Sequence, residues 1–133
     1  MILRPAEPRD AAAIRQIEEE SGSHSWDYLR YECTVAEMGG SAAGYFLVRK
    51  VADDEFEILN VAVARQFRRH GIAEALIRTQ LKAKKGSWFL EVRQSNLAAR
   101  SLYQKIGFQE EGRRPHYYSD PPESGIVMSI RSC

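Results

Sequence analysis

The spacing of apolar and polar residues along the chain predicts an alternation of strands and helices. Apolar runs, alternating or continuous, indicate strands over residues 2–4, 31–38, 42–51, 55–63, 88–92, 108–118 and 126–130. Apolar residues at helical spacing indicate helices that begin near Asp10, after Gly71 and at Asn96, and that end at Gly22, Gly86 and Gly107. This order is typical of an α/β fold with a mixed central sheet flanked by helices on both faces.

Turn-forming residues mark the limits of these elements. Turns are expected at Gly39-Gly40, Asp53-Asp54 and residues 120–122. Pro115 is expected to interrupt the strand over residues 108–118, because proline cannot donate a ladder hydrogen bond. Asp10 is expected to cap the first helix or to place its carboxylate in the first turn. Residues 23–29 are expected to be irregular, with one helical turn around Trp26 as the alternative.

Length and charge narrow the class of protein. The 133 residues, of which 44% are hydrophobic and 28% charged, predict one globular domain over residues 1–133. The 19 basic and 18 acidic residues nearly cancel, which argues against a broad surface for nucleic acid or membrane. No apolar run suits a membrane span or a secretory signal, and Cys33 and Cys133 lack metal-ligand spacing. We therefore expect a cytoplasmic protein with free thiols.

The stretch 61–77 is the strongest candidate for a ligand site. The apolar run Val61-Ala62-Val63 leads through the basic turn Arg68-Arg69-His70-Gly71 into good helix formers. The first amides of a helix have no intrahelical partner and carry partial positive charge, so a phosphate can bind there. Gly71 would let the backbone come close to such a ligand. The alternative is a tight strand-to-helix turn whose basic side chains are only solvated.

Two further side chains could handle protons. Glu91 stands in the most apolar strand, where burial would raise its pKa toward the range of a general base. The alternative is that it lies at the splayed end of the strand, in water or paired with Arg93. Tyr103 lies on the apolar stripe of the last helix, either as a proton donor in a cleft or as a core tyrosine with its tip in water. Asn96 is expected to cap that helix.

A second basic cluster, formed by Arg113, Arg114 and His116, stands beside Tyr117-Tyr118. We interpret it as a solvated strand end, with RNA or a ribosomal protein as alternative partners. The three histidines show no metal-ligand spacing, so no metal site is expected. The chain also lacks a serine nucleophile elbow and a complete phosphate-binding loop motif.

Two motifs follow one another in the chain. The first is Arg68-x-x-Gly71-x-Ala73 after Val61-Ala62-Val63, and the second is Leu90-Glu91-Val92-Arg93-x-Ser95-Asn96-x-x-Ala99-x-x-Leu102-Tyr103-x-x-Ile106-Gly107-Phe108. Together they resemble the GNAT family of N-acetyltransferases, most of all the bacterial subgroup that acetylates ribosomal proteins at their N-terminal alanine. The resemblance covers nearly the whole chain. It implies the GNAT (acyl-CoA N-acyltransferase) fold, and acetyl-CoA as co-substrate.

The resemblance also implies roles for individual residues. The backbone of Val61, Ala62 and Val63 would hold the acetyl group and the pantetheine arm of acetyl-CoA. The rest of the cofactor site would be Arg68 and the pyrophosphate loop of Arg69, His70, Gly71, Ile72, Ala73 and Glu74, with Asn96 in contact with CoA. Glu91 would accept a proton from the acceptor amine, and Tyr103 would donate one to the departing thiolate. Because the amine attacks directly, Cys33 would be a bystander.

The acceptor implied by the resemblance is a primary amine, most of all the N-terminal α-amine of a protein such as a ribosomal protein. A lysine side chain, a polyamine or another small amine is an alternative, and so is a CoA-sensing module without turnover, since fold alone does not decide function. The chain departs from the subgroup on the acceptor side. Residues 23–29 form a short connection, and Ser124-Gly125 stands where an acidic residue is expected.

Overall fold

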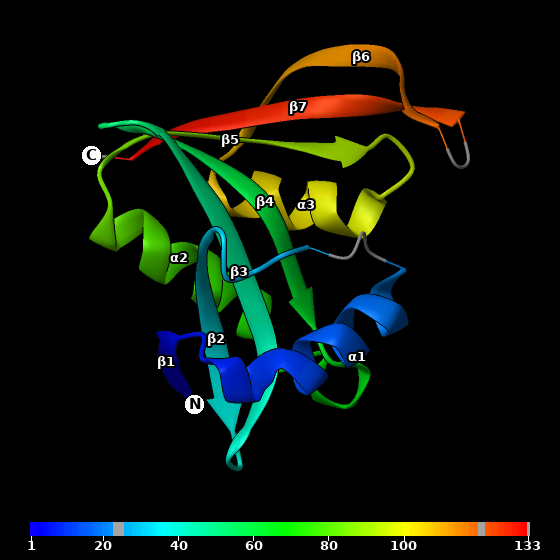
Figure 1. The fold of residues 1–133 in the computed structure, drawn as a ribbon. Helices are drawn as coiled ribbons and strands as arrows, with labels where there is room; N and C mark the ends of the chain where they lie inside the picture. The colour runs from blue at the N-terminus through cyan, green and yellow to red at the C-terminus, as the bar shows by residue number, and fades with distance from the viewer. Residues whose placement is uncertain (23–25, 120–121, 133) are drawn as a thin grey trace. The chain divides into compact units, whose positions relative to one another are not determined.

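The computed structural model describes residues 1–22, 26–119 and 122–132 (Figure 1). The chain divides into one unit made of Met1–Arg49 and Ile58–Gln80 and a second made of Lys50–Glu57 and Leu81–Cys133. The single domain expected over residues 1–133 stays a prediction. Expectations for residues 23–25 and 120–121 lie outside the described residues. Within the described part of the chain, no helix has the length and apolar character needed to cross a membrane.

Four strands of the first unit are arranged in sequence order. They are β1 (Ile2–Pro5), β2 (Glu32–Met38), β3 (Ser41–Ala52) and β4 (Glu55–Val63). The end of β3 and the start of β4, within residues 50–57, belong to the second unit. β2 is antiparallel to both β1 and β3. Between β2 and β3, Gly39 and Gly40 both have positive φ, at 59° and 82°, as the tight turns of hairpins require. The predicted hairpin is confirmed.

The helices of the first unit begin and end close to the predicted positions. They are the 3-10 turns η1 (Pro8–Asp10) and η2 (Arg65–Phe67) and the helices α1 (Ala11–Ser21) and α2 (Ile72–Ala83), the last of which ends in the second unit. Gly22 ends α1 in the left-handed conformation, as predicted. Asp10 occupies the N-cap position of α1, one of the two places expected for it, but its side chain makes no capping hydrogen bond to that helix. The carboxylate instead lies in the first turn of η1, where it accepts two hydrogen bonds from Arg4 at 2.8 Å.

The connection from α1 to β2 is irregular where it is described. Arg30 donates its N–H to the Asp27 carbonyl at 3.0 Å, which forms a single turn, and no helix occurs over residues 26–31. Glu18 of α1 is buried and accepts a hydrogen bond from the Trp26 N–H at 2.9 Å. The irregular segment that was predicted is therefore confirmed for its described residues, and it is tied back to α1 by a carboxylate.

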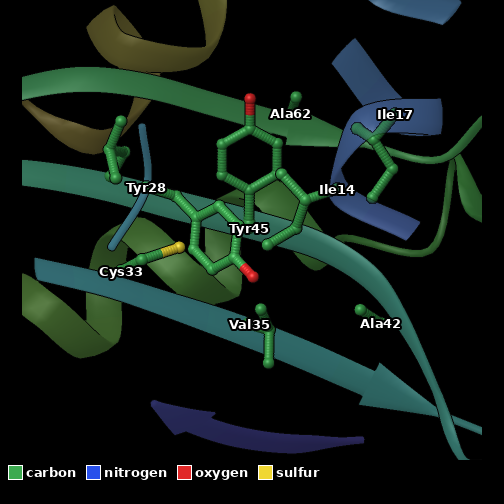
Figure 2. Close-up of a cluster of buried hydrophobic side chains, with 9 residues drawn as sticks. Ile14, Ile17, Tyr28, Cys33, Val35, Ala42, Tyr45 and Ala62 are labelled. Carbon is green, nitrogen blue, oxygen red and sulfur yellow. The ribbon is translucent and has the colours of Figure 1, made fainter. Parts of the chain in front are cut away.

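Apolar side chains of α1, β2 and β3 gather in the core of the first unit (Figure 2). Ile14 and Ile17 of α1 are each only 1% exposed and belong to the same cluster as the buried Tyr45. The Tyr45 hydroxyl accepts a hydrogen bond from Asn60 at 2.7 Å, so this buried oxygen is not left unpaired. Cys33 lies in the same cluster, and burial raises the pKa of its thiol to about 12.

The second unit confirms that the sheet is mixed. It contains β5 (Gly86–Arg93), α3 (Leu97–Ile106), β6 (Gln109–Ser119) and β7 (Pro122–Ser132). The strand order is β4-β5-β7-β6. The first residues of β4 pair with β5 in parallel, whereas β7 is antiparallel to both β5 and β6. Figure 1 shows β6 and β7 as a long pair in orange and red.

The break predicted at Pro115 is wrong, because β6 continues through this residue. β6 is the last strand in the order, and an edge strand tolerates a residue without an N–H better than a central strand does. The pairing of β6 with β7 nevertheless changes register between Arg114 and Tyr118. Proline therefore disturbs the ladder here without ending the strand. β7 starts at Pro122, which the sequence had assigned to a turn.

β5 carries the apolar core of the second unit. Trp88 is fully buried and stacks on Phe56 of β4, with ring centroids 4.7 Å apart. Its indole N–H donates to the Lys84 carbonyl at 3.1 Å. The strand begins at Gly86, where φ is 144° and where an added Cβ would lie 2.3 Å from the Asp54 carbonyl oxygen. Only glycine lets the backbone pass so close to Asp54.

Candidate active site

The connection between β4 and α2, in the first unit, contains the residues that were expected to bind phosphate. The Arg68 side chain turns back onto β4 and donates to the Val63 carbonyl at 3.2 Å. Arg69 and Gly71 both have positive φ, at 69° and 73°. A non-glycine residue in this conformation costs about 1–3 kcal/mol, and such strain tends to gather at ligand sites. The loop between β4 and α2 thus contains two left-handed residues, one of which is not glycine and is strained.

The loop ends in a helix N-terminus of the kind that binds anions. The first hydrogen bond of α2 runs from the Ala75 N–H to the Gly71 carbonyl at 3.0 Å. The first amides of a helix generally have no acceptor one turn back, and the helix dipole adds partial positive charge there. His70 Nδ1 lies 3.0 Å from the carbonyls of Phe67 and Arg68, so this nitrogen must be the donor. The groups of this loop suit a phosphate or diphosphate ligand.

Glu91, on β5 in the second unit, is a largely buried carboxylate. Its side chain is 11% exposed, and its Oε1 lies 3.3 Å from Nη1 of Arg114 on β6. Its Oε2 is buried and has no hydrogen-bond partner among residues 1–22, 26–119 and 122–132. Arg93, the partner considered from the sequence, pairs instead with Glu123 at 3.3 Å. The alternative of a solvated or Arg93-paired Glu91 is therefore wrong.

Burial is the main influence on the pKa of Glu91. It raises the pKa above the usual value, because a carboxylate is less well solvated in the protein than in water. Arg114 opposes this effect through its charge, Glu57 of β4 adds to it, and hydrogen bonding by the Tyr117 side chain lowers the pKa. Glu91 thus combines a raised pKa with a buried oxygen that has no partner in the described part of the chain, and both features are expected of a general base.

Tyr103, on α3 in the second unit, is buried, as its place on the apolar stripe predicted. Its ring packs edge-to-face against Phe108, with centroids 5.2 Å apart. Its carbonyl accepts hydrogen bonds from the N–H groups of Gly107 and Phe108, which fixes the end of α3. Burial raises the pKa of the Tyr103 hydroxyl, so this group keeps its proton at neutral pH.

Asn96 caps α3, as predicted, because its side-chain oxygen accepts a hydrogen bond from the Ala99 N–H at 3.2 Å. The turn before it is held by β7. Glu123 accepts a hydrogen bond from the Ser95 N–H, and Gln94 donates its N–H to the Ser124 carbonyl at 3.0 Å. The start of α3 is thus attached to the start of β7.

Replacing Asn96 with alanine is expected to lower the free energy of unfolding by about 1 kcal/mol, because the Ala99 N–H loses its capping partner. Urea-induced unfolding measures this change. Asn96→Asp keeps an oxygen acceptor at the same place and is expected to retain most of the stability. Equal losses in the two variants would show that the cap is not the cause.

Glu123 and Arg114 are the residues that sequence reasoning missed. Glu123 was passed over because an acidic residue was expected at the position of Ser124-Gly125. Glu123 lies one position earlier, where its carboxylate accepts a hydrogen bond from the Ser95 N–H and pairs with Arg93. Arg114 was assigned to a solvated strand end. Its side chain is 60% exposed, but its guanidinium contacts the buried Glu91. The basic cluster was a signal for this contact, since a buried carboxylate favours a cation nearby.

The structure places the predicted site residues in two groups. Val61–Val63 and Arg68–Glu74 lie in the first unit, whereas Glu91, Asn96 and Tyr103 lie in the second. The catalytic and cofactor roles expected of them stay predictions. Within residues 1–22, 26–119 and 122–132, no group of three His, Cys, Asp or Glu side chains is arranged to hold a metal ion.

Known proteins similar to this chain are acetyltransferases. The model of the acetyltransferase (GNAT) family matches residues 4–108. The ribosomal protein bS18-alanine N-acetyltransferase of Escherichia coli (strain K12) is 32% identical over an alignment of 141 positions, which covers 93% of this chain and 93% of that protein.

Solved structures show the same fold. Ard1 from Thermoplasma volcanium has a TM-score of 0.90 and 28% identity, and the match covers 99% of this chain and 97% of that one. The ribosomal-protein-S18-alanine N-acetyltransferase from Escherichia coli has a TM-score of 0.81 and 26% identity, with 98% and 93% covered. The fold predicted from the sequence is confirmed.

Proposed function

Because this chain belongs to the GNAT family of acetyltransferases, we propose that it transfers the acetyl group of acetyl-CoA to the α-amine of a protein N-terminus. Family membership makes it an acetyl-CoA-dependent N-acetyltransferase. One observation supports this acceptor most strongly. The Escherichia coli relative, by its name, acts on alanine of ribosomal protein bS18, and its likeness extends over 93% of both chains. A ribosomal protein that begins with alanine is therefore the acceptor we expect.

The connection between β4 and α2 is the proposed site for the donor. Bound acetyl-CoA supplies an acetyl group activated as a thioester. The backbone of Val61, Ala62 and Val63 would hold the acyl arm, and Asn96 would contact CoA. The pyrophosphate would be bound by Arg68, Arg69, His70, Gly71, Ile72, Ala73 and Glu74. The positive φ of Arg69 and Gly71 and the helix N-terminus that follows support this assignment.

Glu91 is the proposed base and Tyr103 the proposed acid. An ammonium group has no lone pair with which to attack a thioester, so a base must first take a proton, directly or through water. Glu91 suits this task because burial raises its pKa and leaves Oε2 without a partner among the described residues. Tyr103 suits the donation of a proton to the thiolate because a tyrosine hydroxyl carries its proton at neutral pH, and burial does not remove it.

Three acceptors test the proposed function. The first is a lysine-free peptide that begins with alanine, the second is the same peptide with a blocked α-amine and one lysine, and the third is spermidine. We expect acetylation of the first alone, measured by mass spectrometry with acetyl-CoA present. Acetylation of the blocked peptide or of spermidine instead would identify a lysine or small-amine acetyltransferase and contradict the proposal.

Thermal unfolding with acetyl-CoA provides the control for the donor. A ligand at 100 times its dissociation constant stabilises the native state by about 2.7 kcal/mol if it binds only that state. Acetyl-CoA is therefore expected to raise the melting temperature whether or not an acceptor is present. Stabilisation without turnover on any of the three amines would favour the CoA-sensing alternative.

A further inference from the structure

Glu91 and Arg114 lie on the same face of the second unit's strands. In the ladders, Glu91 of β5 is opposite Val127 of β7, and Arg114 of β6 is opposite Gly125 of β7. Val127 and Gly125 are two residues apart, so their side-chain positions point to the same face. The Arg114 side chain can therefore reach diagonally across β7 toward Glu91.

Gly125 leaves space for this approach. A Cβ added at Gly125 would lie 3.1 Å from Cδ2 of Tyr117, which means that the Tyr117 ring occupies the space above this glycine. The Arg114 guanidinium in turn lies 5.4 Å from the centroid of the Tyr117 ring, in a cation–π contact. Arg114 thus packs against Tyr117, and the Tyr117 ring packs against Gly125, although the Arg114 side chain remains largely exposed.

The contact with Arg114 is made by one oxygen of Glu91 only. Nη1 lies 3.3 Å from Oε1, whereas Oε2 is buried without a partner among the described residues. A buried polar atom without a partner costs about 1–3 kcal/mol, and a catalytic role is one of the explanations for such an atom in a native protein. The two oxygens of this carboxylate are therefore in different situations, one held by a cation and one left to accept a proton.

We propose that Arg114 is a positioning residue for acetyl transfer, which binds Oε1 of Glu91, fixes the orientation of the carboxylate and keeps it ionised, so that Oε2 can accept the proton of the acceptor amine. Arg114 has this role only if Glu91 is the base, so the inference rests on the proposed function. Arg114 itself does not touch the reacting atoms in this mechanism.

The charged and titratable groups around Glu91 determine in which direction its pKa moves when Arg114 is replaced. Glu57 of β4 and burial raise the pKa of Glu91, while Arg114 and Tyr117 of β6 lower it. Tyr118 of β6 also interacts electrostatically with Glu91. Removing the charge of Arg114 leaves burial and Glu57 unopposed by a cation. The pKa of Glu91 must then rise, and the base stays protonated up to a higher pH.

Replacing Arg114 with glutamine tests this inference. The acid limb of the pH profile of kcat/KM is expected to move to higher pH by about one unit. This is the lower end of the range by which a nearby opposite charge shifts a pKa. Arg114→Lys keeps the charge and is expected to restore most of the wild-type profile. The control is Arg113→Gln, because Arg113 precedes Arg114 on β6 and its side chain alternates to the other face.

A direct measurement separates this inference from the proposed function. The pKa of the Glu91 carboxyl, followed by carbon-13 NMR in the acceptor-free protein, needs no turnover and is expected to rise in Arg114→Gln but not in Arg113→Gln. An unchanged NMR pKa, or an acid limb that does not follow it, would overturn the positioning role. Wild-type turnover in Glu91→Gln would instead show that the base is another group, which is a failure of the proposed function.

Discussion

Replacing Glu91 with glutamine is expected to lower kcat by about 10²- to 10⁴-fold, the range that general-base catalysis usually contributes. Glutamine has nearly the same shape but cannot accept the proton of the acceptor amine. The acceptor would then have to lose its proton to solvent before it attacks. Steady-state rates of acetylation of an alanine-terminated peptide measure this effect.

The binding of acetyl-CoA is the control for this variant. Glu91 is not among the residues proposed to hold acetyl-CoA, and glutamine keeps nearly the same size and shape at this position. The rise in melting temperature caused by acetyl-CoA is therefore expected to be close to that of the wild type. Glu55→Gln makes the same chemical change at an exposed strand residue and is expected to leave kcat unchanged. Equal kcat values in the two variants would contradict the assignment of Glu91 as the base.

Gly86→Ala is expected to have the largest effect on stability, lowering the free energy of unfolding by about 3 kcal/mol or more. The new Cβ would lie 2.3 Å from the Asp54 carbonyl oxygen and 2.8 Å from its carbon. The backbone cannot easily move away, because the next residue, Ser87, donates its N–H to the same oxygen at 2.8 Å. The φ of 144° at Gly86 adds strain for any L side chain.

Thermal and urea-induced unfolding measure this loss, and a fall in melting temperature of roughly 10 °C is expected. Gly112→Ala is the matched control. A Cβ added at Gly112 meets no atom within 4 Å, and its φ is not positive. This variant should stay close to the wild type. Similar losses at Gly86 and Gly112 would mean that the close approach to Asp54 is not what makes glycine necessary.

Local signals in the sequence were sufficient to predict the hairpin turn and the helix ends of the first unit. Gly22 and Gly39-Gly40 have the positive φ that glycine favours, and this preference acts within a few residues. Asp10 was less predictable, because Arg4 competes for its carboxylate from a neighbouring strand. Pro115 was misjudged for a similar reason. The free-energy cost of a proline in a strand depends on whether that strand lies at the edge of the sheet, and the edge position of β6 is a property of the whole sheet.

For the candidate site, the sequence predicted burial better than partners. The apolar strand around Glu91 suggested a buried carboxylate beside a solvated alternative, and the helical stripe placed the Tyr103 ring in the core; both side chains are largely buried. The contact between Glu91 and Arg114 depends on the register of β6 against β7, which shifts between Glu110 and Gly112. Such a shift reverses which side chains face each side of a sheet, so it decides between Arg113 and Arg114. No local pattern in the sequence marks its position.

The burial of Cys33 offers a way to observe how often the first unit opens. A thiol with a pKa of about 12 is almost entirely protonated at neutral pH, and the thiolate is the form that reacts with electrophiles. Cys33 therefore becomes reactive only when α1 and the strands around it separate for a moment. The rate at which a thiol reagent modifies the peptide that contains Cys33 would report the frequency of these local opening events, in the presence or absence of acetyl-CoA.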